Sequence, residues 1–281
     1  MQFQLLRLVL LRRTQPDMFE ERGPDGTEIT REKWLRRIFT GNIEYQHRGS
    51  ECHFVPAEDF DEAPFIVGRM GRKRKIDENE PPSSGLKETS RDTWKAAIVL
   101  IDPRHHDDGQ KIAMEIDAQI GDPFALFSSL AEHINSRSTS EPYYLEVNPI
   151  TDPSDFWSFE LENRGEITSI SFGLLAPNMF GIRDDFDKEM RALRDNERAQ
   201  KAKLELYNKD GLQLNTERVR QTVGYTLEGG GTVKAKSKKG RRFDSTKRAS
   251  KKTIQTELPS DEEPPSFLTK AKRAISGIFK S

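Results

Sequence analysis

The sequence predicts an α+β fold, in which a mixed β-sheet is covered by helices and is followed by a flexible C-terminal tail that ends in a short amphipathic helix. Segments with strand periodicity are repeatedly separated by segments with helix periodicity, which favours a sheet with helical cover. Residues 95–102 and 110–117 are both strand-like, and the turn-like composition between them predicts an antiparallel hairpin. A purely parallel sheet is therefore excluded.

The stretch between residues 143 and 178 carries the clearest signals. Residues 143–150 have the pattern of a strand, and residues 153–163 have that of a helix, which Asp152 can cap and Gly165 can end. In residues 167–175, apolar residues alternate with small or polar ones, as expected of a strand with one face on the core. The stretch therefore predicts a strand, a helix and a strand in succession.

The other elements are predicted from the same signals: apolar runs or alternation for strands, and a capping residue followed by an apolar stripe for helices. Before residue 143 they are a strand (2–12), a polar loop (15–28), a helix capped by Thr30 (30–39), an irregular segment (41–64), a brief strand (65–67), an exposed acidic loop (77–88), the hairpin and a helix (122–135). After residue 178 they are a charged helix (184–200), a strand (202–206), a turn (208–211), a helix (216–227) and a last strand (232–236).

The predicted domain organisation is a single core over residues 1–257, with a division into 1–90 and 91–257 as the alternative. An acidic, proline-rich linker follows at residues 258–266, and a basic amphipathic helix follows at residues 267–281.

The overall composition identifies no class of partner. The 281 residues carry 45 basic and 46 acidic side chains, so that local charge blocks are more informative than the net charge of -1. Cys52 is the sole cysteine, which excludes an intrachain disulfide and favours a reducing, cytoplasmic location. No run approaches the roughly 20 apolar residues of a membrane span. Arg7 interrupts the leucine-rich N-terminal run, which favours a first strand over a signal peptide.

Five short runs resemble an uncharacterised bacterial family of hypothetical proteins. The runs are residues 67–71, 94–102, 108–111, 146–150 and 176–181. The resemblance covers most of the chain before Leu258. It implies no activity and no site residues.

The strongest charge signal is a basic block between Thr232 and Lys252, which holds ten bases against one acid, Asp244. Closely spaced cations release counterions from a phosphate backbone, so the block predicts nucleic-acid binding through phosphates. The alternative is a solvated basic tail without a specific partner. A second basic cluster, from Arg69 to Lys75, joins the same surface if the fold brings the two together. The residues predicted to contact nucleic acid are Lys234, Lys236, Lys238, Lys239, Arg241 and Arg242 in the block, and Arg72, Lys73 and Arg74 in the second cluster.

A run of imidazoles and carboxylates is a candidate metal site, because these groups bind divalent metals. The run comprises Asp102, His105, His106, Asp107 and Asp108, with Glu115 and Asp117 on the next predicted strand. Adjacent histidines do not readily face one ion, and Asp-Pro and Asp-Gly are ordinary turn sequences. The favoured interpretation is a structural turn, so no metal and no cofactor is expected.

Catalytic signatures are weaker still. Cys52 and His53 are neighbours in sequence only, whereas an activated nucleophile needs a base that meets it in space. The glycines Gly229, Gly230 and Gly231 follow a predicted helix instead of preceding one, which suits a joint more than a phosphate-binding loop. No catalytic residue is predicted.

The predicted C-terminal helix carries an apolar face beside several lysines and arginines. Such a helix suits an anionic membrane surface or the groove of a protein partner. The alternatives are that it packs on its own domain or stays disordered. The residues predicted to make this contact are Phe267, Leu268, Ile275, Ile278 and Phe279.

The leading hypothesis is a non-catalytic protein that binds nucleic acid, DNA or RNA, through its basic C-terminal region. The alternatives are an interaction protein docked to a membrane or a protein partner by its terminal helix, and a metal-dependent nuclease or toxin that uses the loop from Asp102 to Asp108. A role in bacterial defence is an expectation from analogy.

Overall fold

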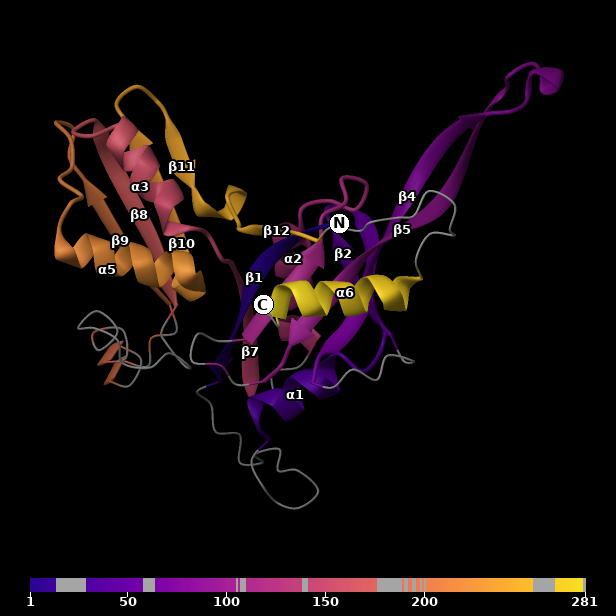
Figure 1. The fold of residues 1–281 in the computed structure, drawn as a ribbon, viewed down its shortest axis with the longest axis horizontal. Coiled ribbons are helices and arrows are strands. Elements are labelled where there is room, and N and C mark those ends of the chain that lie inside the picture. Colours follow the sequence, from indigo (N-terminus) through magenta and orange to yellow (C-terminus); the bar gives the residue numbers. More distant parts are fainter. Residues whose placement is uncertain are drawn as a thin grey trace.

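A computed structural model of the chain describes residues 1–13, 29–57, 64–104, 106, 110–137, 141–175, 189, 192–193, 196–197, 199, 201–254 and 266–279. These residues form two β-sheets with helices packed on them (Figure 1). The predicted α+β class is thus confirmed. The predicted loop at 15–28 lies outside the described residues, as do most of the helix at 184–200 and of the linker at 258–266.

The first sheet has the strand order β12-β1-β6-β5-β4-β3-β2, and β7 also pairs with β1. One edge of β1 pairs with β6, while β12 and β7 follow one another along its other edge. Its strands are β1 (Gln2–Arg12), β2 (Ile43–His47), β3 (Ser50–Pro56), β4 (Ile66–Asn79), β5 (Glu88–Asp102), β6 (Gln110–Glu115), β7 (Tyr143–Pro149) and β12 (Lys251–Thr253).

The second sheet has the order β11-β10-β8-β9. Its strands are β8 (Ile167–Leu175), β9 (Lys201–Tyr207), β10 (Gly231–Ser237) and β11 (Arg242–Asp244). The helices are α1 (Arg31–Ile38), α2 (Pro123–Arg137), α3 (Pro153–Glu162), α5 (Glu217–Tyr225) and α6 (Phe267–Phe279), with short helical turns η1 (Pro82–Ser84), η2 (Thr226–Gly230) and η3 (Ser245–Lys247).

The prediction of a mixed sheet is wrong, because all pairings between the described strands are antiparallel. A strand, a helix and a strand in succession often return the chain parallel to itself within one sheet. Here α3 instead carries the chain from β7 in the first sheet to β8 in the second. The helix therefore connects two sheets and not two neighbouring strands.

Both faces of the first sheet are covered. Alternate residues of β1 point to opposite faces, so Leu6, Leu8 and Leu10 enter a core shared with α1 and α2, while Phe3 enters a core shared with α6. Figure 1 shows α6 lying across this sheet. Burial on both faces explains why β1 reads as a nearly continuous apolar run.

Only one face of the second sheet carries helices. Phe172 on β8 and Val233 on β10 point into a core with Phe156 of α3 and Val223 of α5. Figure 1 shows this sheet beside the first one, on the opposite side of the molecule from the long β4–β5 hairpin. Among the described residues, no helix packs directly against its other face, which looks across a hollow toward α2, and this face is where the candidate site lies.

Two strands occupy the segment predicted to be irregular. Within residues 41–64, β2 and β3 form a hairpin whose two-residue turn, Arg48 and Gly49, has φ angles of 49° and 74°. Both residues lie in the left-handed region, as the tight turns that join antiparallel strands require. Ile43 and Tyr45 face the core, alternating with exposed residues.

The strands β4 and β5 are much longer than the predicted ones. Beyond Arg72, β4 pairs only with β5, so residues 73–94 form a two-stranded arm that extends from the sheet (Figure 1). The ends of the predicted loop at 77–88 belong to these strands. The alternative domain boundary at residues 90–91 falls inside β5.

The basic block is folded and is not a tail. After β10, the chain forms β11 in the second sheet and then β12, in which Lys251 pairs with Gln4 of β1. The terminal helix α6 then packs on the first sheet, where Ala271 and Ile275 join Leu100 in one core. The strand β12 and the helix α6, which follow the second sheet in the chain, thus complete the first sheet and its core.

Candidate nucleic-acid interface

The uncovered face of the second sheet is polar and basic. The strand register places Lys234 opposite Ser171 and opposite Asp244, and it places Lys236 opposite Ser169 and opposite Arg242. The side chains of β8 on this face are thus short, and the longer lysine side chains of β10 flank them. On the other side of β8, Lys203 and Tyr207 are exposed on β9, at alternate positions that point to the same face.

Two adjoining hollows lie along this face. The larger, of about 760 Å³, is bounded by α2 and β7 on one side and by the second sheet on the other. The smaller, of about 550 Å³, continues past β10 toward η3. Ser171 and Lys234 line both hollows, so the two form one groove.

The groove is more basic than acidic. Its lining comprises seven basic side chains against four acidic ones. The basic residues are Lys201, Lys203, Lys234, Lys236, Arg242, Lys247 and Arg248, and the acidic residues are Glu132, Glu146, Glu205 and Asp244. A positive cleft with low-dielectric walls concentrates anions.

Three of the predicted contact residues lie on this face: Lys234, Lys236 and Arg242. The Lys234 ammonium lies 3.6 Å from Asp244. Lys236 and Arg242 have no ion pair with a described carboxylate. Of these three predicted contacts, Lys236 and Arg242 are therefore more available to an anionic ligand than Lys234.

The block contains three further predicted contacts, Lys238, Lys239 and Arg241. They lie in the turn between β10 and β11 and do not line the groove. Lys239 is 2.8 Å from Glu166, and Arg241 is 3.3 Å from Glu162. Lys238 donates a hydrogen bond to the carbonyl oxygen of Asp210. These exposed contacts are individually weak, but they direct the three cations toward the protein's own surface.

The second basic cluster lies elsewhere. Arg72 donates hydrogen bonds to the carbonyl of Ile120 and the hydroxyl of Ser50, so it holds parts of the first sheet together. Lys73 lies 3.2 Å from Asp92, and the hydrogen bond to that carboxylate raises the pKa of the ammonium. Arg74 is exposed on the arm. Figure 1 shows β4 and β10 on opposite sides of the molecule, so the two basic clusters do not meet.

The lysines of β9 were not among the predicted contacts. Lys201 and Lys203 alternate with Ala202 and Leu204, and this alternation was used only to predict the strand. The same period of two places both lysines on the groove side of β9. Lys201 is already paired with Glu146, at 2.5 Å.

Four of the five predicted partner-binding residues of α6 pack against the first sheet: Phe267, Ile275, Ile278 and Phe279. Ile275 and Ile278 are buried, and the ring of Phe279 packs against Phe65 at 5.1 Å. The guanidinium of Arg69 lies 4.0 Å from the centre of the Phe267 ring. Leu268 is half-buried. The apolar side of the helix thus packs on its own chain, which is the alternative recognised from the sequence.

The candidate metal loop is an ion-pair cluster as far as the structure describes it. Asp102 is 2% exposed, and it accepts hydrogen bonds from Arg104, at 2.8 and 2.9 Å, and from His106, at 2.8 Å. Burial opposes ionisation of Asp102, but these hydrogen bonds outweigh it and lower the pKa of the carboxyl. His105, Asp107 and Asp108 lie outside the described residues.

The two acids of β6 and its following turn do not complete that cluster. Asp102 pairs with Lys111, four residues before Glu115, which corresponds to roughly 13 Å along a strand. Glu115 instead accepts a hydrogen bond from the backbone of Ile98, and Asp117 accepts one from that of Gln119. Both carboxylates have structural partners.

The adjacent Cys52 and His53 are not a catalytic pair. They are consecutive residues of β3, so Cys52 is buried in the core while His53 points to the opposite face. Burial raises the pKa of the Cys52 thiol, which disfavours the nucleophilic thiolate. The chain at the glycines after α5 passes very close to β1, because a Cβ at Gly229 would lie 2.6 Å from Cβ of Arg7.

Comparisons with known proteins found no matching family model, no matching curated protein and no matching solved structure. Among the described helices, none has the length and apolar character needed to cross a membrane.

Proposed function

We propose that the protein binds nucleic acid, without catalysing a reaction, along the groove on the uncovered face of the second sheet. The observation that carries this proposal is that β9, β10 and β11 each place cations on the one face of the second sheet that has no helix packed directly on it, beside two adjoining hollows. Lys236 and Arg242 are the central contacts, because no described carboxylate pairs with them. The proposal places the protein in a reducing cytoplasm, consistent with its single, buried cysteine.

Phosphate contacts dominate the proposed interaction. The small residues of β8 allow a sugar-phosphate chain to approach the sheet closely, while the lysines on either side neutralise it. Base stacking is the smaller part of the proposed interaction, because Phe243 is buried and points to the helix-covered side, although Tyr144 and Tyr207 are aromatic side chains on the groove side. Binding is therefore expected to depend little on sequence and strongly on salt.

The test is fluorescence anisotropy with labelled single-stranded DNA, single-stranded RNA and duplex DNA over a range of salt concentrations. The matched variants are Lys236→Ala/Arg242→Ala in the groove and Arg74→Ala/Lys75→Ala on the arm. Each double variant removes two exposed positive charges. A difference in affinity between the two variants therefore reflects the location of the charges and not the net charge of the protein.

Loss of Lys236 and Arg242 should weaken binding to all sequences alike and should reduce the slope of log affinity against log salt by about 1.4 for single strands and about 1.8 for duplex DNA, for two lost phosphate contacts. The arm variant should behave as the wild type. Absence of binding at low salt, or an equal loss in both variants, would reject the groove as a nucleic-acid interface.

The possible role in bacterial defence remains a proposal from analogy alone. Membrane or partner docking through α6 requires that helix to leave the first sheet, because its buried side chains form part of that sheet's core.

A further inference from the structure

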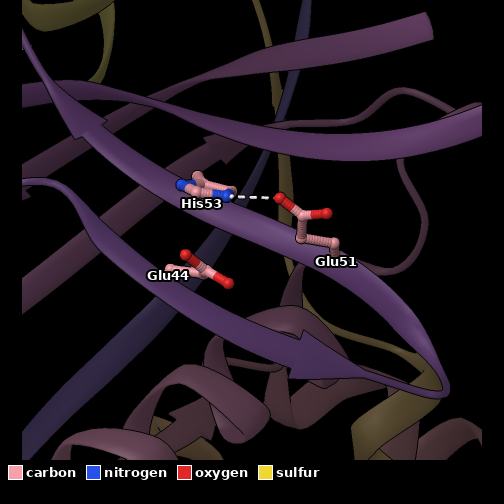
Figure 2. Close-up of side chains that lie close together, drawn as sticks. All are labelled: Glu44, Glu51 and His53. Atoms are coloured by element: carbon pink, nitrogen blue, oxygen red, sulfur yellow. Dashed lines mark hydrogen bonds and ion pairs between the residues drawn. The ribbon is translucent and has the colours of Figure 1, made fainter. Parts of the chain in front are cut away.

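Three side chains of the kinds that bind metals lie together on the outer face of the β2–β3 hairpin, whose residues do not line the groove (Figure 2). Glu44 is directly opposite His53 in the strand register, and Glu51 precedes His53 by two residues, so all three point to one face. One ligand atom from each lies within 4.8 Å of the others. Figure 2 shows the Glu51 carboxylate facing a ring nitrogen of His53, and the Glu44 carboxylate beside them on the neighbouring strand.

The imidazole is held in place from three directions. Its Nδ1 lies 3.0 Å from Oδ1 of Asn42, and its Nε2 lies 3.1 Å from Oε1 of Glu51. The ring meets Trp94 edge-on, with 5.1 Å between ring centres. The second oxygen of Glu51 lies 3.7 Å from the ammonium of Lys73, which orients the carboxylate and leaves Oε1 directed at His53.

Both ring nitrogens of His53 face oxygen acceptors. In the tautomer that donates its N–H from Nδ1 to Asn42, the lone pair of Nε2 points toward Oε1 of Glu51, so both atoms can bind one cation placed between them. Metal-binding histidines commonly donate their other N–H to an oxygen acceptor in this way, which fixes the tautomer and the ring orientation.

The spacing of the ligand atoms suits zinc. Bonds of about 2.0 to 2.1 Å in a tetrahedral site place neighbouring ligand atoms roughly 3.3 Å apart. The separation of 3.1 Å between Nε2 and Oε1 is close to this value. Glu44 is exposed, so its carboxylate can rotate toward the same point without disturbing the core. Two carboxylates also balance the two charges of the ion.

We propose that Glu44, Glu51 and His53 bind one Zn²⁺ ion, with the fourth tetrahedral position open to water or to an external ligand. The ion joins β2, the edge strand of the first sheet, to β3, and it thereby stabilises the edge. The site is independent of the groove and of nucleic-acid binding.

The test is isothermal titration of the full chain with ZnCl₂ after treatment with a chelator, and with MgCl₂ as a second arm. The wild type should bind zinc at this site and should not bind magnesium there, because magnesium prefers an all-oxygen shell. Glu44→Gln should lower zinc affinity at least tenfold, and His53→Ala should abolish binding at this site. His106→Ala is the control, since it removes a histidine that also contacts a carboxylate.

A second readout identifies the bound atom directly. Addition of zinc should shift the Nε2 resonance of His53 in a ¹⁵N spectrum of the imidazoles, whereas a metal-free ion pair of His53 with Glu51 gives no zinc-dependent change. Absence of zinc binding by the wild type, or unchanged affinity in both Glu44→Gln and His53→Ala, would overturn the proposal. Loss of binding in His106→Ala alone would assign the ion to the Asp102 cluster instead. If circular dichroism shows that His53→Ala is unfolded, the Glu44→Gln result decides.

Discussion

Asp102 is a buried carboxylate that accepts hydrogen bonds from Arg104 and His106. Removing an ionised group from water is costly unless its oxygens are hydrogen-bonded. Arg104 and His106 supply those hydrogen bonds and come from the residues just after β5, so the chain satisfies the carboxylate locally. The cluster fixes the path of the chain as it leaves the sheet.

Replacing Asp102 with Asn should destabilise the fold by about 1 to 3 kcal/mol near neutral pH, because it removes charge-assisted hydrogen bonds at a buried position. Urea denaturation measures the change. Asp77→Asn is the matched control, since Asp77 is exposed on the arm. An equal effect of the two substitutions would show that Asp102 has no special structural role.

The effect of Asp102→Asn should depend on pH in a defined direction. The pKa of Asp102 in the folded protein lies below its ordinary value of 3.8, so its contribution is fully present above that value. The contribution is lost as the pH falls through the folded-state pKa. The difference in unfolding free energy between wild type and variant should therefore shrink in acid, and a constant difference would contradict this assignment.

At the level of single residues, the sequence located the cations but not their partners. Lys239 pairs with Glu166, and Arg241 pairs with Glu162, although more than seventy residues separate the members of each pair. Such pairs depend on how β10 lies against β8 and α3. A count of charges along the chain contains no information about this register.

At the level of elements, apolar strands and capped helices were predictable, and polar strands were not. The limits of β1 and β8 match the predicted strands, because their apolar patterns are long and regular. The edge strand β2 was missed because its inward positions include His47. The strand β11 was missed because Phe243 is its single apolar residue.

The helix α6 should be an integral part of the first sheet's core. Ile275→Ala should lower the free energy of unfolding by about 2 to 5 kcal/mol, since the side chain is completely buried against that sheet. Ser276→Ala, at the next and exposed position, should have little effect. Chemical denaturation compares the two variants. Similar stabilities would mean that the helix is not docked in solution.

At the level of the whole molecule, the existence of strands and helices was predictable but their assignment to two sheets was not. The alternation of apolar and polar residues in β7 and β8 indicates that each strand has a buried face. It does not indicate which sheet each strand joins. The groove lies between α2, β7 and the second sheet, so its position follows from this arrangement. It therefore had no signature in the sequence beyond the lysines themselves.

The arm extends beyond the body of the protein and contributes little to its core. Replacing residues 80–87 with Asn-Gly should join Asn79 to Glu88, which already face one another, through a two-residue turn. The residues removed are mostly exposed, so the unfolding free energy should change by no more than about 0.5 kcal/mol. Thermal denaturation and the anisotropy assay check this. A loss of nucleic-acid affinity would place the arm in the interface.

The pairing of β1 with β12 joins two segments that are synthesised at very different times. Residues 2–4 are synthesised long before the strand that pairs with them on this edge, which ends at Thr253. At about 5 to 20 residues per second, these residues wait roughly 12 to 50 seconds for that partner strand. During this interval their backbone groups on this edge are open to other chains, which makes this end of β1 a natural point of engagement for a chaperone.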